Sequence, residues 1–328
     1  MTGYACGRWL QGLACAFALI ALTASGHAQS DYPNKPVRII VPYGAGGIAD
    51  TTVRILAEKL NARFNQQFVV ENRPGAGGIV AAKAGAAAPP DGYVLSLTGN
   101  HNAISRSLFK SIPYDILTEF TSISITAYFD LMLVTRAESP FKSVQDVIAF
   151  ARANPGKLNI GSINPGSTQN LAAELLKVAT GAKVTIVPFR TSPEMATAVL
   201  RGDIDIAFEF YAALQGPIAD KKVVVLATTG ATRTSYLPDV PTVKESGIPD
   251  YEVSSWNGIS APAGTPPEIV NLLSTAIIEA LKSPDVQQKA KQFGMEARGS
   301  TPEEMTARMK HDIAKWAALI EKAGLEKQ

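Results

Sequence analysis

The chain has 328 residues, of which 46% are hydrophobic, and its 31 basic and 29 acidic residues leave a net charge of +2. This length suffices for one large or two medium-sized globular domains. The balanced charge, without basic runs interleaved with aromatic residues, argues against a nucleic-acid partner. No apolar stretch after residue 28 is long enough to span a bilayer.

The N-terminal segment predicts export. Arg8 is its only charged residue and precedes an apolar run over 9–22, which is followed by small residues that end at Ala28. This pattern is typical of a secretory signal peptide cleaved after Ala28, and the run is too short for a membrane span. Lipid attachment at Cys15 is a weaker alternative, because the apolar run continues past this cysteine. We therefore expect a periplasmic protein without residues 1–28.

Cleavage would also remove reactive groups. Cys6 and Cys15 both lie in the leader, so the mature chain has no disulfide, thiolate nucleophile or cysteine metal ligand. Loss of His27 leaves only His101 and His311, which argues against a histidine-rich metal site, although carboxylates alone can bind a hard cation. The chain also lacks a Gly-x-Ser-x-Gly nucleophile elbow. We expect no metal, no cofactor and no enzymatic activity.

From residue 37 onward, strand-like and helix-like segments alternate. In the first half this pattern predicts a strand at 37–41, a glycine-rich turn to residue 50, a helix whose apolar face runs from 53 to 64, a strand at 68–70, a second glycine-rich turn at 72–78, an alanine-rich helix and a strand at 93–97. Such alternation is typical of an α/β architecture with a mostly parallel sheet.

The second half repeats the same order of segments. It predicts helices that start near 143, 171, 192, 265 and 301, strands at 158–160, 184–187, 204–208 and 223–226, and a polar turn at 161–168. No fixed period links the copies, so the chain is not a repeat protein. The spacing alone leaves one or two domains open.

The first glycine-rich turn allows two interpretations. Its Gly-x-Gly-x-x-Ala pattern over 44–49, with Glu71 at the end of the next strand, matches a dinucleotide-binding fingerprint. A periplasmic oxidoreductase that uses a nucleotide is therefore the alternative function. Export, the lack of a proton-transfer partner and the tight turn directly after Glu71 argue against it.

Both interpretations share one physical feature. Glycines let the backbone approach a ligand, and a helix N-terminus offers unpaired N–H groups and a positive dipole end. The turn is thus a candidate anion site. The alternative is that its glycines only allow a sharp turn of the chain from strand to helix. We expect Asp50 to be the N-cap of the helix, with its carboxylate occupied by helix amides.

The polar turn at 161–168 is a second candidate anion site. It carries hydroxyls and an amide and leads into a helix. One helix end contributes ~0.3–1 kcal/mol to holding an anion, whereas micromolar affinity needs about 8 kcal/mol. Two such ends therefore suit a ligand clamped between two lobes.

These residues resemble the extracytoplasmic receptors of tripartite tricarboxylate transporters, also called Bug-type solute-binding proteins. The motifs that carry the resemblance follow one another along the mature chain: Tyr32-Pro33-Asn34-Lys35-Pro36, Gly46-Gly47-Ile48-Ala49-Asp50, Glu71-Asn72-Arg73-Pro74-Gly75, Pro90-Asp91-Gly92-Tyr93, Gly166-Ser167, Val187-Pro188-Phe189, Gly202-Asp203-Ile204-Asp205, Leu237-Pro238-Asp239-Val240-Pro241-Thr242 and Trp256 with Ala261-Pro262-Ala263-Gly264. Each motif is weak alone, but their order is specific.

The resemblance implies a type II periplasmic-binding-protein fold, in which two α/β lobes are joined by two crossovers. Carried onto this chain, lobe 1 spans 32–128 plus 254–328 and lobe 2 spans 129–253. It also implies that backbone amides and ordered waters hold a ligand carboxylate. The matching positions are Tyr43, Gly44, Ala45, Gly46, Gly47, Ile48, Ala49, Asp50, Thr98, Asn100 and His101 on lobe 1, and Ser162, Asn164, Gly166, Ser167, Thr168 and Asp205 on lobe 2.

The chain departs from the family at Phe189-Arg190-Thr191, where Tyr-Lys-Gly is common. Arg190 keeps a positive charge and adds a planar bidentate donor, so we include it among the candidate ligand contacts. The implied partners are a small organic carboxylate and the membrane subunits of a tripartite tricarboxylate-type transporter, with the receptor acting as a monomer. A ligand-presenting sensory role is a further alternative, and the sequence leaves the ligand's identity open.

Overall fold

The computed structural model describes residues 32–163 and 166–327. The predicted signal peptide, its cleavage site and Asn164 lie outside the described residues. The chain from Pro36 onward forms one compact unit, which holds all the elements discussed below. None of the described helices is long and apolar enough to cross a membrane.

The first group of strands is built on β1. Four of its five residues are apolar and buried, and the strand pairs in parallel with β2 and β3, while β3 pairs antiparallel with β9. The elements of this group are β1 (Val37–Val41), α2 (Ile48–Phe64), β2 (Phe68–Asn72), the short helix η1 (Ala76–Gly78), α3 (Ile79–Ala86), β3 (Val94–Gly99), α4 (Asn100–Leu108) and β9 (Ser254–Pro262). We call this the first strand group.

The second strand group is built on β5 in the same way. This strand pairs in parallel with β6 and β7, and its connections are helical. Its elements are α5 (Val144–Ala153), β5 (Asn159–Ile163), α6 (Thr168–Thr180), β6 (Thr185–Phe189), α7 (Ser192–Arg201), β7 (Ile206–Phe210), α8 (Tyr211–Ala219) and β8 (Val223–Thr228).

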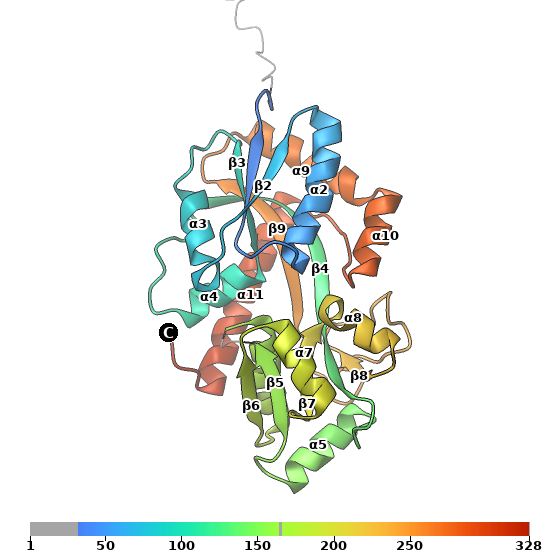
Figure 1. Cartoon of the computed structure of the whole chain (residues 1–328). Helices are drawn as coiled ribbons and strands as arrows, with labels where there is room; N and C mark the ends of the chain where they lie inside the picture. Colours follow the sequence, from blue (N-terminus) through green and yellow to red (C-terminus); the bar gives the residue numbers. More distant parts are fainter. Residues whose placement is uncertain (1–31, 164–165, 328) are drawn as a thin grey trace, which may run out of the picture. The chain divides into compact units, whose positions relative to one another are not determined.

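One long strand, β4 (Phe120–Arg136), belongs to both groups. Its residues 120–130 pair antiparallel with β9, and its residues 131–136 pair antiparallel with β7 and β8. In Figure 1, β4 and β9 run side by side out of the first group toward the second. The expectation of a mostly parallel sheet is therefore wrong for these two strands, whose described pairings are all antiparallel. The lobe boundaries at 128/129 and 253/254 stay a prediction.

Three helices form the C-terminal part of the chain that the structure describes. They are α9 (Pro267–Leu281), α10 (Pro284–Gln292) and α11 (Pro302–Ala323). Helix α11 begins at a capping box formed by Thr301 and Glu304, and it contacts α4, β4 and α6. Its Trp316 and the β9 residue Trp256 are both fully buried, and Trp256 Nε1 donates to Asp312 Oδ2 over 2.7 Å. The C-terminal helix thus packs on elements of both strand groups.

Candidate functional site

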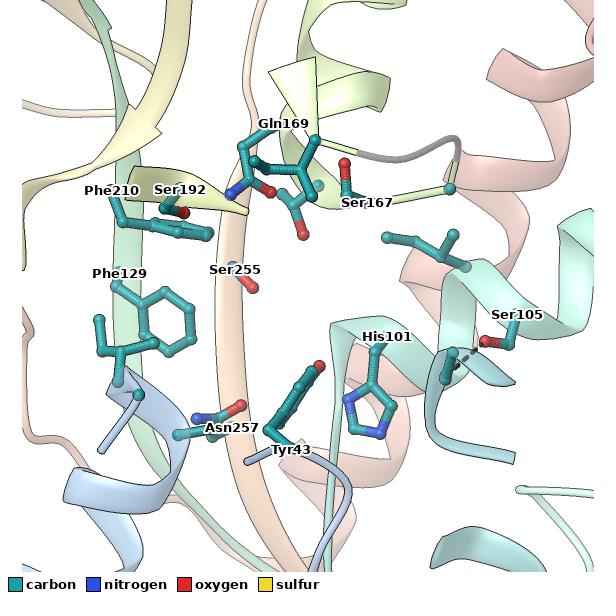
Figure 2. A pocket seen from close by; sticks show the side chains of 18 of the residues that line it. Tyr43, His101, Ser105, Phe129, Ser167, Gln169, Ser192, Phe210, Ser255 and Asn257 are labelled. Atoms are coloured by element: carbon teal, nitrogen blue, oxygen red, sulfur yellow. Dashed lines mark hydrogen bonds between the residues drawn. The ribbon is translucent and has the colours of Figure 1, made fainter. Parts of the chain in front are cut away.

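A cavity of about 710 Å³ lies where strands of both groups end. Tyr43 follows β1, Ile163 ends β5, Arg190 follows β6 and Phe210 ends β7, and all four line the cavity. Parallel strands that end at one edge bring their following turns together, which is where ligands bind in open α/β sheets. Figure 2 shows the side chains that converge on this cavity.

Among the described α-helices, four have a first-turn residue at the cavity, namely α4 with His101 and the three helices α2, α6 and α7. Ala49 of α2, Thr168 of α6 and Ser192 of α7 line it, and each belongs to the first turn of its helix. The amides of a first turn have no intrahelical acceptor, and the helix dipole adds positive potential there. The cavity is thus surrounded by backbone donors from both strand groups.

The same local bond shapes all three turns. The residue before each N-cap donates its amide to the side chain four positions on: Gly46 to Asp50 (2.9 Å), Gly166 to Asn170 (3.3 Å) and Arg190 to Glu194 (3.2 Å). These bonds hold each turn folded back over its helix. In α6 the N-cap Ser167 also accepts from Asn170 N over 3.0 Å.

The predicted role of Asp50 needs a correction. The N-cap of α2 is Gly47, and Asp50 stands three residues into the helix with its side chain turned back. Burial alone would raise the pKa of Asp50, but hydrogen bonds from Arg54, Gly46 and Asn72 hold it below its usual value. The Asp50 carboxylate is therefore fully engaged in bonds within the protein, and the Gly46 N–H group is engaged by it.

The charges around the cavity favour an anion. No aspartate or glutamate occurs among the described lining residues, and Arg190 is the one lysine or arginine among them. His101, in the first turn of α4, packs edge-on against Tyr43 with the ring centroids 5.5 Å apart. Desolvation by burial lowers the pKa of His101 to about 4, so the imidazole is neutral at pH 7 and offers an N–H without a charge.

One wall of the cavity is apolar and was not expected from the sequence. Phe129 of β4 and Phe210 of β7 meet edge to face with their centroids 5.3 Å apart, and both line the cavity (Figure 2). Ile104 and Leu108 of α4 also line the cavity. Apolar residues in strands and helices look like core residues in a sequence, so only the convergence of the elements distinguishes them.

The structure brings half of the predicted site residues to the cavity. Those that line it are Tyr43, Gly47, Ile48, Ala49, His101, Gly166, Ser167, Thr168 and Arg190. Those that are described but do not line it are Gly44, Ala45, Gly46, Asp50, Thr98, Asn100, Ser162 and Asp205.

The predicted polar residues that do not line the cavity make hydrogen bonds in other parts of the protein. Thr98 shares a hydrogen bond with Ser260 (2.7 Å), and Ser162 Oγ donates to Ile163 O (2.9 Å). Asp205 precedes β7 and accepts from Asn159 N over 2.7 Å, at the strand ends opposite the cavity. The prediction that Asp205 faces the cleft is corrected for this reason.

Asn100 has a bridging position instead. Its Oδ1 accepts from Trp316 Nε1 (2.6 Å), and its Nδ2 donates to Thr168 Oγ1 (3.1 Å). Asn100 therefore helps to position Thr168, which lines the cavity, without lining the cavity itself.

Glu71, the candidate ribose ligand of a nucleotide site, is engaged by two arginines. It accepts from Arg73 Nε over 2.6 Å and pairs with Arg38 at 3.4 Å. Its carboxylate therefore stabilises the turn after β2. Within the part of the chain that the structure describes, no three histidine, cysteine, aspartate or glutamate side chains cluster in a way that could hold a metal ion.

Comparison with known proteins identifies the family. The family model for the tripartite tricarboxylate transporter family receptor matches residues 52–325. The chain belongs to this receptor family. The predicted resemblance is thus confirmed, and so is the prediction that the chain is not an enzyme, since the family consists of solute receptors. BugT of Bordetella pertussis, a relative, is 32% identical over 315 residues, which cover 95% of this chain and 96% of BugT.

Solved structures agree with this assignment. Rpa4515 of R. palustris, solved with adipate, is 33% identical with a TM-score of 0.81 and covers 89% of this chain and 98% of its own. The periplasmic binding protein BugD is 31% identical with a TM-score of 0.78, at coverages of 90% and 100%. MatC from Rhodopseudomonas palustris, with bound malate, is 26% identical with a TM-score of 0.76, at coverages of 88% and 100%. These structures confirm that this receptor has the type II periplasmic-binding-protein fold.

Proposed function

We propose that this chain is a periplasmic receptor that binds a small organic carboxylate in the cavity at the N-termini of α2, α6 and α7. It then delivers the ligand, as a monomer, to the membrane subunits of a tripartite tricarboxylate-type transporter. The observation that carries the proposal is the convergence of three helix N-termini on a cavity without an acidic residue among its described lining. Adipate in Rpa4515 and malate in MatC support a carboxylate as the ligand class.

The affinity has a physical basis. A single helix end supplies ~0.3–1 kcal/mol toward an anion, so three ends supply at most about 3 kcal/mol of the about 8 kcal/mol that micromolar binding requires. Hydroxyls from Ser167 and Ser192, the Arg190 charge and contact with the apolar wall must add the rest. Because these groups come from both strand groups, we expect the two predicted lobes to close on the ligand.

Gly47→Val tests the site. Gly47 has φ −78° and ψ 171°, which valine adopts, and an added Cβ would come no closer than 3.9 Å to a neighbour. The fold should therefore survive while the side chain obstructs the amides of α2. We expect at least a tenfold loss of affinity for the tightest acid in a thermal-shift panel of malate, adipate, succinate and benzoate.

Gly44→Val is the matched control. Gly44 lies in the same turn, does not line the cavity and has no atom within 4 Å of an added Cβ. We expect wild-type affinity from this variant. Equal affinity in both variants would show that the turn is only structural, and a wild-type chain that none of these acids stabilises at 10 mM would contradict the proposed function for this class of ligand.

A further inference from the structure

A buried carboxyl group stands directly behind one end of the cavity. Glu209 of β7 is 1% exposed, and its Oε1 accepts from Gln169 Nε2 (3.1 Å) and from Phe210 N (2.7 Å). Gln169, in the first turn of α6, is 7% exposed and lines the cavity, whereas Glu209 does not. Figure 2 shows the Gln169 amide at the cavity between Ser192 and Ser167.

These bonds determine which way the Gln169 amide faces. Oε1 of Glu209 already accepts from the Phe210 amide, so a proton on this carboxyl group would sit on Oε2. Gln169 must then donate its NH₂ group to Oε1 whether Glu209 is charged or neutral. The Gln169 oxygen is left as a hydrogen-bond acceptor, and it makes no hydrogen bond within the described part of the chain.

This acceptor differs from the backbone amides and the arginine around it. The first-turn amides of α6 and α7 and the Arg190 side chain are all donors, and they suit the oxygens of a carboxylate. A plain carboxylate or alkyl chain cannot bond to the Gln169 oxygen and would leave this acceptor unpaired once the ligand covers it. A hydroxyl or amino group on the ligand would satisfy it, and sites of this kind reject analogues that lack the donor.

We propose that the ligand carries an O–H or N–H donor close to its carboxylate and that this donor bonds to Gln169 Oε1. The ligand class is then a hydroxy- or amino-substituted carboxylic acid. Glu209 is a positioning residue, which sets the orientation of Gln169 without touching the ligand. This inference rests on the proposed function and narrows its ligand class.

The test compares acids that differ by one donor. Isothermal titration of the mature chain would use two series, succinate with malate and aspartate, and phenylacetate with mandelate and phenylglycine. In any series that binds, we expect one of the substituted acids to bind at least tenfold more tightly than the unsubstituted acid. The member that binds best tells a hydroxyl from an amino group. Equal or tighter binding of the unsubstituted acid would overturn the inference while leaving the proposed function in place.

Gln169→Met tests the residue itself. Methionine has a similar volume but no oxygen acceptor, so we expect the preference for the substituted acid to fall to about twofold or less, with the unsubstituted acid unaffected. Gln215→Met, the same substitution on α8 outside the cavity, is the matched control and should keep the full preference. A preference that Gln169→Met leaves unchanged would overturn the assignment. No detectable binding in either series would count against the proposed function and, with it, against this inference.

Two changes at Glu209 separate positioning from simple packing. In Glu209→Gln an amide oxygen can still accept from Gln169 and Phe210, so the preference should survive. In Glu209→Leu nothing holds the Gln169 NH₂ group, the amide is free to rotate, and the preference should fall as in Gln169→Met. Loss of the preference in both variants, or in neither, would contradict a positioning role.

Discussion

His101 illustrates how neighbouring residues set the chemistry of one side chain. A Cβ on Gly78 would come within 2.8 Å of His101 Cδ2, so the glycine at that position makes room for the imidazole. Tyr43 covers the ring edge-on, and burial keeps the imidazole neutral at pH 7. The second glycine-rich turn, which was predicted only as a reversal of the chain, thus supports a residue of the cavity.

The lowered pKa of His101 predicts a pH dependence of stability. Between about pH 4 and 6.5 the unfolded chain binds a proton on this residue that the folded chain does not, so folding stability falls as the pH drops through this window. We expect the wild type to lose about 2 kcal/mol more than His101→Gln between pH 7 and pH 4. Urea unfolding of both chains at several pH values measures this, and parallel pH profiles would contradict it.

Helix α6 shows how the start of an element is specified. Its N-cap Ser167 follows Gly166, whose φ of +84° lies in the left-handed region that favours glycine. Leu108 of α4 packs directly against this glycine, and its Cδ2 would lie only 2.3 Å from a Cβ added to Gly166. Backbone conformation and packing therefore both require glycine where α6 presents its amides.

Substitutions at the two ends of α6 test this. Gly166→Ala combines backbone strain with a clash, so we expect it to cost about 3 kcal/mol and to weaken ligand binding at least tenfold. Gly181→Ala, at the C-cap, has φ +65° but open space around the added Cβ, so it should cost about 1 kcal/mol and leave affinity unchanged. Denaturant unfolding and titration calorimetry measure both effects, and equal costs at both ends would contradict the role of Leu108.

At the scale of elements, prediction succeeded where the signals are local and failed for the two long strands. β1 was predicted at its observed bounds, and the starts of α7 and α11 lay close to their predicted positions, because capping residues and apolar periodicity are local signals. β4 and β9 were not predicted as strands. β9 is buried at all but its first residue and β4 at most of its residues, neither shows a simple alternation of apolar and polar residues, and the two pair with each other across a long stretch of sequence.

At the scale of the whole molecule, one chain of hydrogen bonds links the two strand groups. Asn100 of α4 accepts from Trp316 of α11 and donates to Thr168 of α6, and all three residues are buried. Thr168 also lines the cavity. The link thus couples the packing of the C-terminal helix to the position of a ligand-contacting element.

A double-mutant cycle tests this coupling. Asn100→Ala leaves the Trp316 N–H buried without an acceptor and should cost about 2 kcal/mol, whereas Thr168→Val should cost about 1 kcal/mol. Because the two residues share a hydrogen bond, we expect the double variant to be more stable than the sum of the single costs predicts, by about 1 kcal/mol in urea unfolding. Additive costs would show that the bond carries no energy across the two groups.

The sequence by itself predicted the compartment, the α/β class and the family. It also predicted the two turns that precede α2 and α6 at the cavity. These follow from local patterns, because capping, turn chemistry and apolar periodicity act over a few residues. The tertiary structure decided which members of those turns face the cavity, removed Asp205 and Thr98 from it and added Phe129, Phe210 and Gln169. Which face a side chain presents depends on strand register and on elements far away in the chain, and Gln169 acquires its role only because β7 places Glu209 beside it.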